Sequence, residues 1–299
     1  IRLGRVCWLT DLARNSGVRR ACNSWNYNKS IPGLDWFSRW PAHSCVGNFY
    51  RNESIVELKR RIDLELWIVF SLSLGKSAIY SVLAFISAIT APVGLRGSST
   101  TINQSVDPRQ WLDFSYQFAG IMFQIVPVAL TLFLVGRGAL AKFGITKTKL
   151  AKQLGIGFAI AAGIGIPGLG FYLGARALGL SARVVPNDIN EFWWTAPVLL
   201  LAAAAASILE EGIMVGYLFH RLRERGLSDN KIILLSALVR GSYHLYQGIG
   251  GLVGNIIMGL LFGYWYKRTG KLVPLLFAHF LIDAVVFVGY AWASTWLPL

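Results

Sequence analysis

The chain has 299 residues, of which 54% are hydrophobic and only 15% are charged. Soluble domains usually carry about a quarter charged residues, so this composition argues against a soluble globular protein and favours a membrane protein. The formal net charge of +14 could suggest nucleic acid, but Lys and Arg lie in short clusters between apolar runs. Because no basic stripe interleaved with aromatics continues through a folded segment, we interpret the charge as membrane topology and expect no nucleic-acid partner.

Residues 1–55 show neither a 3.6-residue nor a 2-residue hydrophobic period, so the pattern assigns no helix or strand to them. We expect a poorly ordered tail or a misassigned start, followed by one transmembrane domain over residues 56–299. No signal peptide is expected, because the first long apolar run begins only near Leu64. The cysteines are three in number and support neither a disulfide framework nor a zinc ribbon. They are Cys7, Cys22 and Cys45.

Seven apolar runs follow, each close to the 20 residues that a transmembrane helix needs. They cover residues 66–93, 112–135, 153–175, 194–219, 231–248, 251–267 and 272–292. The N-terminal flank and the segments 137–152, 221–231 and 267–271 are basic, whereas the alternate loops hold fewer Lys and Arg. The positive-inside rule then places the N-terminus in the cytoplasm and the C-terminus outside. The predicted fold is an all-α polytopic transmembrane helix bundle of about seven spans.

Glycines in the fifth and sixth predicted spans indicate packing rather than chemistry. Gly259 and Gly263 stand four residues apart, a spacing that lets helix backbones approach closely. Four glycines between residues 248 and 254 mark a tight turn between these two short spans. A shallow or re-entrant hairpin is therefore an open alternative to two full crossings.

Six ionisable side chains lie well inside the last four apolar runs. They are Glu210, Glu211, Arg240, His244, His279 and Asp283. A buried acid or Arg costs about 2.5 to 3.5 kcal/mol at mid-membrane, so these groups must meet one another or water. Counted from the basic end of each span at about 1.5 Å per residue, the acids and histidines of three helices lie roughly 12 to 20 Å deep. Asn255 of the sixth span falls in the same layer.

Spacing within the helices assigns partners to these groups. His279 and Asp283 stand four residues apart and share one helix face. Glu210 and Glu211 diverge by about 100°, so one acid faces a reacting centre while the other meets a structural partner. Arg240 lies on the face of His244 and is the expected cation for that second acid.

Such a layer supports hydrolysis. A Glu beside a His in a dry setting can take a proton from water, and a second His can donate a hydrogen bond to the oxyanion. The same layer could instead hold zinc, with Glu210, His244 and His279 as ligands. Spacing does not separate the two schemes, and interhelical hydrogen bonding or a proton-coupled transporter site are further interpretations.

The motifs resemble those of the CAAX protease and bacteriocin-processing enzyme family, membrane proteins related to the type II CAAX prenyl endopeptidase. That family carries a Glu-Glu motif with a later Arg, a His preceded four residues earlier by Phe, and a His followed four residues later by Asn or Asp. The matching segments are Glu210-Glu211-Gly-Ile-Met-Val215-Gly216, Arg240-Gly-Ser-Tyr-His244 and His279-Phe-Leu-Ile-Asp283. Order, spacing and placement agree over about residues 194–292.

Two positions depart from the family pattern. Val215 stands where the family usually has Arg, and Arg240 stands where it usually has Phe. We hypothesise that the cation has moved, so that Arg240 neutralises Glu211 from the neighbouring helix. An Arg240 side chain that faced lipid would contradict this hypothesis.

The resemblance implies an intramembrane endopeptidase with Glu210 as general base and His244 as its partner in activating water. It implies that His279 and Asp283 bind the oxyanion, with Glu211 in support. An ionised Asp283 cannot donate a hydrogen bond, so orienting His279 is its alternative role.

The resemblance also implies the setting of the reaction. We expect a peptide or protein substrate, lipidated or membrane-associated, in the plasma membrane of a bacterium. No cofactor is expected unless zinc is used. The other functions compatible with such a bundle are a non-catalytic immunity or scaffold protein and a transporter.

Overall fold

The computed structural model describes residues 42–293, with side chains described from residue 54 to residue 289. Contacts divide the chain into two units, Ile1–Ile55 and Val56–Leu299. The expectation of a poorly ordered tail falls mostly on residues 1–41, outside the described residues. For residues 42–55, the sequence pattern predicted no helix or strand. This prediction was wrong, because helix α2 (Ala42–Ser71) begins there. The sequence shows no regular apolar period over residues 42–55, so periodicity did not reveal the start of this helix.

Helices make up most of the described chain, and the predicted all-α bundle is confirmed. They continue as α3 (Leu74–Thr90), α4 (Gly94–Gly97), α5 (Gln110–Val135), α6 (Ala139–Lys142), α7 (Leu150–Ala177), α8 (Thr195–Glu211), the π-helix η3 (Gly212–Tyr217), α9 (Leu218–Glu224), α10 (Asp229–Tyr243), the 3-10 helix η4 (Leu245–Gln247), α11 (Ile249–Thr269) and α12 (Val273–Ala293). Two short strands that the sequence did not predict, β1 (Ser99–Asn103) and β2 (Arg183–Asn187), form a two-stranded parallel sheet.

The number of membrane crossings is only partly supported by helix length. Four helical stretches are long and apolar enough to cross a membrane, namely α5, α7, the continuous stretch Thr195–Glu224 and α11. The pair α2 and α3 forms a fifth candidate, bent by 51° at the break between the two helices. Helix α10 has 15 residues, and α12 passes only as a shorter apolar helix, Val273–Gly289. The count of seven spans and the cytoplasmic N-terminus therefore stay predictions.

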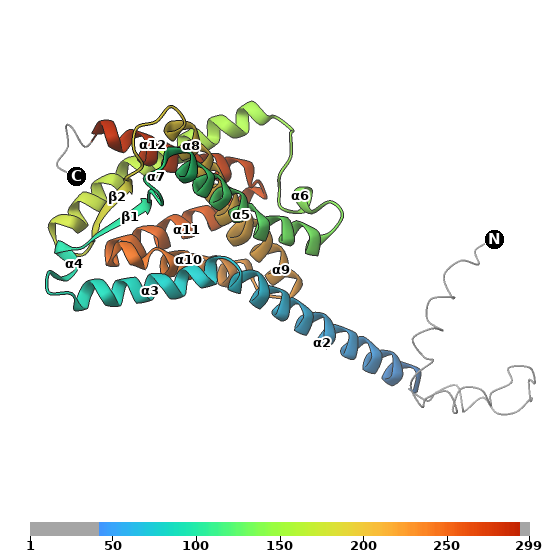
Figure 1. The fold of residues 1–299 in the computed structure, drawn as a ribbon. Helices are drawn as coiled ribbons and strands as arrows, with labels where there is room; N and C mark the ends of the chain where they lie inside the picture. Colours follow the sequence, from blue (N-terminus) through green and yellow to red (C-terminus); the bar gives the residue numbers. More distant parts are fainter. Residues whose placement is uncertain (1–41, 294–299) are drawn as a thin grey trace, which may run out of the picture. The chain divides into compact units, whose positions relative to one another are not determined.

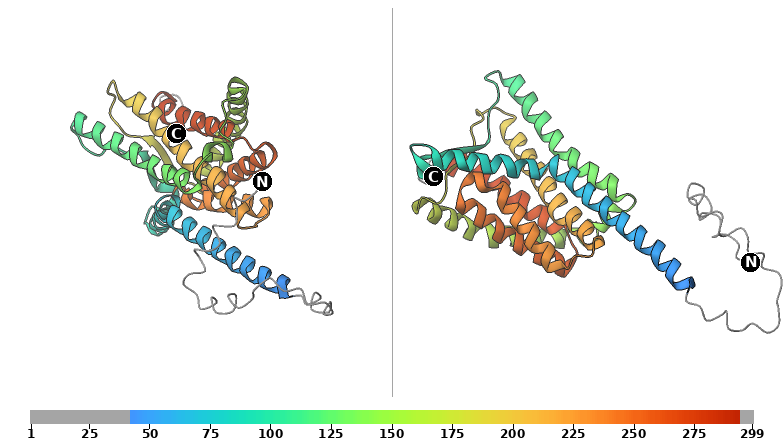
Figure 2. Two further views of the ribbon diagram at one scale, coloured as in Figure 1. Left: turned by 90° about the vertical axis from the view of Figure 1, so that its right-hand side faces the viewer. Right: turned by 90° about the horizontal axis from the view of Figure 1, so that it is seen from below.

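The helices of the second unit form a series of packed neighbours. Contacts join α3 to α10, α10 to α11, α11 to α7, α7 to α12, α12 to α8 and α8 to α5. Figure 1 shows α10 and α11 side by side, and η4 joins them along the chain. The two views of Figure 2 also show these two helices, in orange, close to each other. Segment η3 contacts α5, α10 and α11, so the segment that follows Glu211 lies among these helices.

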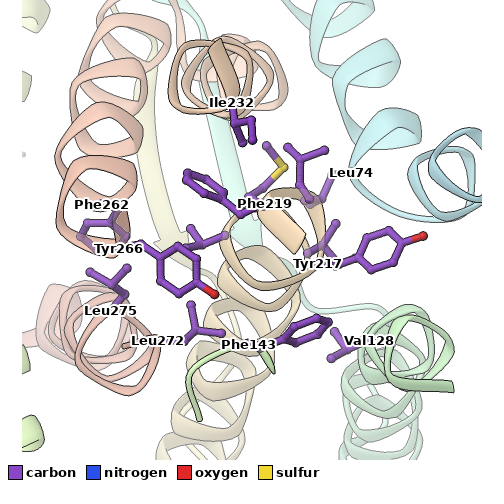
Figure 3. Close-up of a cluster of buried hydrophobic side chains, with 14 of the residues drawn as sticks. Leu74, Val128, Phe143, Tyr217, Phe219, Ile232, Phe262, Tyr266, Leu272 and Leu275 are labelled. Atoms are coloured by element: carbon purple, nitrogen blue, oxygen red, sulfur yellow. The ribbon is translucent and has the colours of Figure 1, made fainter. Parts of the chain in front are cut away.

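The largest group of buried apolar side chains surrounds η3 and α9. Figure 3 shows Tyr217 and Phe219 of this central stretch facing side chains of the surrounding helices and of the segments next to them. These neighbours are Leu74, Val128, Phe143, Ile232, Phe262, Tyr266, Leu272 and Leu275. Gly216 permits a close approach, because a Cβ there would lie 2.9 Å from Cδ2 of Phe143. Dense packing thus fixes the segment that follows the paired acids.

The loop between α7 and α8 is tied to two elements that carry predicted site residues. Ser181 forms an isolated antiparallel bridge with Gly248, and the Ala182 amide donates to the Gln247 carbonyl at 3.0 Å. At the other end of β2, Nδ2 of Asn187 donates to the carbonyl of Phe287 in α12 at 2.7 Å. These contacts fix the turn after His244 and the part of α12 beyond Asp283.

Candidate active site

Glu211 is the centre of a buried polar network. It ends α8, its side chain is 0% exposed, and its Oε1 accepts hydrogen bonds from two other helices. The Nη2 of Arg240 in α10 donates at 2.5 Å, and Nδ1 of His279 in α12 donates at 2.7 Å. A buried carboxylate needs such donors, because hydrocarbon offers none.

Arg240 faces the interior, as the hypothesis of a moved cation requires. Its side chain is 1% exposed, and its Nη1 lies 3.4 Å from Oε2 of Glu210 while Nη2 contacts Glu211. The guanidinium also lies over the ring of Phe262, 5.6 Å from the centroid. Val215 is buried in the apolar part of η3 and offers no polar atom there. One cation from α10 therefore serves both acids of α8.

His279 lies between two carboxylates. Its Nδ1 donates to Glu211, and its Nε2 lies 3.4 Å from Oδ2 of Asp283, one turn along α12. Both ring nitrogens therefore face acceptors, and the ring orientation is set from both sides. This geometry agrees with the orienting role for Asp283, whereas binding of an oxyanion by His279 and Asp283 stays a prediction.

Glu210 has a different environment from its neighbour, as the 100° divergence predicted. Its side chain is 14% exposed, and its Oε2 accepts a hydrogen bond from the hydroxyl of Tyr243 at 2.9 Å. Tyr243 was not among the predicted site residues. The available signal was its place three residues after Arg240, which puts the two side chains on one face of α10.

His244 lies at the end of α10 with a defined ring orientation. Its Nδ1 is 3.1 Å from the backbone carbonyl oxygen of Arg240. A carbonyl oxygen only accepts, so Nδ1 carries the hydrogen, and in the neutral ring Nε2 holds the lone pair. The ring of His244 lies 4.7 Å from that of Tyr243, measured between centroids. His244 is therefore able to accept a hydrogen bond from water through Nε2.

Asn255 does not join this network. Its Nδ2 donates to the carbonyl of Gly251 at 3.0 Å, within α11. The predicted contribution of its amide to the layer stays a prediction, since Nδ2 bonds to the backbone one turn earlier. Depth along a helix says nothing about the direction in which an amide points.

The zinc alternative gains no support from the geometry. Among the described residues, no group of three or more His, Cys, Asp or Glu side chains is placed to hold a metal ion. In the proposed set of Glu210, His244 and His279, the two nitrogens of His279 face Glu211 and Asp283 instead. The expectation that no cofactor is needed stays a prediction.

The π-helix η3 follows Glu211 directly, and this too was not predicted. Short π-helical turns inside α-helices occur frequently at functional sites. Here Oγ of Ser236 in α10 donates to the carbonyl of Met214 at 3.1 Å, which satisfies one carbonyl of the π-turn. The glycines at each end, Gly212 and Gly216, were the only signal for it in the sequence.

Comparison with known proteins agrees with this site. Residues 192–285 match the family model described as type II CAAX prenyl endopeptidase Rce1-like. Searches of curated proteins and of solved structures gave no match. The matched segment contains Glu210, Glu211, Arg240, His279 and Asp283, together with α8, α10 and the first part of α12. With its apolar helices and this match over the whole polar network, the chain is an integral membrane protein whose residues 192–285 are similar to the type II CAAX prenyl endopeptidases.

Proposed function

We propose that this protein is an intramembrane endopeptidase that hydrolyses a peptide bond with a water molecule activated by Glu210 and His244. The observation that carries the proposal is that the two adjacent acids have different environments. Glu211 is fully buried and bonded to Arg240 and His279, whereas Glu210 keeps a partly exposed side chain. One acid is structural, and the other is available for chemistry.

The hydrogen bonds of Glu210 support its role as the general base. Its Oε2 is engaged by Tyr243 and Arg240, and Oε1 has no hydrogen-bond partner among the residues with described side chains. Oε1 takes a proton from water, which His244 holds through Nε2, while the water oxygen bonds to the substrate carbonyl carbon. Glu210 then returns the proton to the leaving nitrogen as the carbon–nitrogen bond breaks. Atoms and charges balance without a further reactant.

The geometry of His279 supports a role in stabilising the oxyanion. Its Nε2 is 3.4 Å from Asp283, which is longer than a normal hydrogen bond, so an N–H at this atom is not firmly held. A developing oxyanion beside Nε2 accepts this hydrogen bond and competes with Asp283 for it. Glu211 keeps the ring in place through Nδ1.

The setting of the reaction follows from the predicted topology. We propose seven crossings with a cytoplasmic N-terminus, which places the layer near the cytoplasmic half of the bilayer. The substrate is a peptide or protein within the membrane, and we propose that it is membrane-associated or lipidated. The plasma membrane of a bacterium stays the expected location.

Mapping of new peptide termini in host membranes tests the proposal. Membranes with the wild-type protein are compared with membranes that hold Glu210→Gln or His244→Ala at equal expression. We expect a loss of product termini by about 100-fold or more, since general acid–base catalysis contributes 10² to 10⁴ in rate.

Glu191→Gln is the matched control, because Glu191 is exposed and lies in the loop before α8. It should leave the termini unchanged. Identical profiles for wild type, Glu210→Gln and His244→Ala would exclude the protease and point to a scaffold that uses the same bundle.

A further inference from the structure

Tyr243 contacts both residues of the proposed water-activating pair. Its hydroxyl donates to Oε2 of Glu210 at 2.9 Å, and its ring lies against that of His244 with a centroid distance of 4.7 Å. The residue is 5% exposed and occupies the last turn of α10. It therefore joins α8 to the end of α10 at the point where both groups are needed.

The hydrogen bond of Tyr243 selects one oxygen of the Glu210 carboxylate. With one oxygen held by the tyrosine hydroxyl and near Nη1 of Arg240, a quarter-turn of the carboxylate plane would break both contacts. A buried hydroxyl without a partner is costly in an apolar layer, so the tyrosine also loses by that rotation. The carboxylate is thus held in one orientation, with Oε1 as the oxygen that receives a proton.

We propose that Tyr243 is a positioning residue of the hydrolytic site. Its hydroxyl orients Glu210, and its ring holds the imidazole of His244 so that Oε1 and Nε2 address the same water molecule. This inference rests on the proposed function. Tyr243 touches neither water nor substrate in this scheme, and it acts only through the two residues that do.

A structural role and a positioning role predict different kinetics. If Tyr243 only fills space, Tyr243→Phe keeps the ring and leaves turnover unchanged. If it positions Glu210, the same variant loses the hydroxyl, and kcat falls while KM stays constant, because substrate binding does not depend on the orientation of the base. Loss of a hydrogen bond to a charged group corresponds to roughly a tenfold or greater fall in rate.

The test uses the full-length protein in lipid nanodiscs and a peptide that carries a cleavage sequence obtained from the terminus mapping. Activity is expressed per folded protein isolated by size-exclusion chromatography, so a lower yield does not enter the comparison. For Tyr243→Phe we expect kcat to fall about tenfold or more and KM to stay within twofold. Tyr266→Phe is the control, because this buried ring packs on Phe219 outside the network and should leave both constants unchanged.

A double-mutant comparison separates the positioning role of Tyr243 from the proposed protease function. Tyr243→Phe added to Glu210→Gln should cause no further loss, because the hydroxyl acts through Glu210. Unchanged kcat in Tyr243→Phe, or an additional loss in the double variant, would overturn the positioning role while leaving the protease intact. If Glu210→Gln itself cleaves normally, the proposed function fails, and the role of Tyr243 fails with it.

Discussion

Arg240 is the residue on which the two adjacent acids of α8 depend. It is 1% exposed and contacts both carboxylates, so its removal would leave negative charges in an apolar layer with fewer donors. The cation stands on α10, whereas the family pattern places it within the Glu-Glu motif itself. The hydrogen bond to Glu211 explains how the chain accommodates Val215 at the usual position of that Arg.

The first prediction at the residue scale concerns two substitutions that together restore the family arrangement of the cation. Arg240→Phe should destabilise the protein by about 3 to 5 kcal/mol, the usual effect of removing one partner of a buried ion pair. Adding Val215→Arg should recover part of this loss, because a cation then returns to Glu211 from its own helix. Denaturant unfolding in mild detergent measures both effects.

Arg225→Ala provides the comparison for that experiment. Arg225 pairs with Asp63 where both side chains are partly exposed, so its loss should change stability far less. No recovery in the Val215→Arg and Arg240→Phe double variant would show that η3 cannot supply the cation. An Arg240→Phe protein as stable as wild type would contradict the importance of the pair.

Sequence reasoning at the residue scale found the charges of the site but not its neutral donors. Glu211, Arg240, His279 and Asp283 were expected together, because charges inside apolar runs must meet one another. A tyrosine hydroxyl costs far less to bury than a charge and is common in membrane helices, so nothing in the composition distinguished Tyr243.

At the scale of elements, long apolar runs were predictable and locally irregular segments were not. Helices α5, α7 and α11 lie close to the predicted spans, because each is set by its own composition. The strands depend on pairing between residues more than 80 positions apart, as between Ser99 and Arg183. The break between α2 and α3 likewise lies inside one apolar run, 66–93, that was predicted as a single span.

The close packing of α10 and α11 gives a prediction at this scale. A Cβ at Gly259 would lie 2.8 Å from Cα of Ala237 and 3.3 Å from Cδ of Arg240. Gly259→Ala should therefore push the two helices apart, displace Arg240 and lower stability by about 1 to 3 kcal/mol. The free energy of unfolding measured in detergent and the yield of product termini should both fall.

Gly163→Ala in α7 is the matched control for this change. A Cβ at Gly163 would meet nothing within 4 Å, so the substitution should be neutral or slightly stabilising. If both variants had the same stability, close approach at Gly259 would not be what holds the hairpin.

At the scale of the whole membrane domain, the contact between the α7–α8 loop and η4 indicates on which side of the membrane the short helix α10 ends. At about 1.5 Å per residue its 15 residues reach only about 22 Å, less than the 30 Å of a typical hydrocarbon core. The bridge between Ser181 and Gly248 nevertheless joins the turn after α10 to the loop that follows the long helix α7. If α7 crosses the membrane, this turn lies on the same side as the end of α7, and the hairpin counts as two crossings.

Cysteine labelling measures this topology directly. In a chain with Cys7, Cys22 and Cys45 replaced by Ser, a single cysteine is introduced at Lys147, Glu191 or Ile249. A membrane-impermeant maleimide added to intact cells should label Glu191→Cys and Ile249→Cys, whereas Lys147→Cys should react only after the membrane is opened. This pattern follows from the basic segment 137–152 in the cytoplasm and from the bridge beside Ile249, which is 41% exposed. Labelling of Ile249→Cys only in opened membranes would instead show that α10 and α11 form a re-entrant hairpin. The site would then be reached from the cytoplasm through this hairpin.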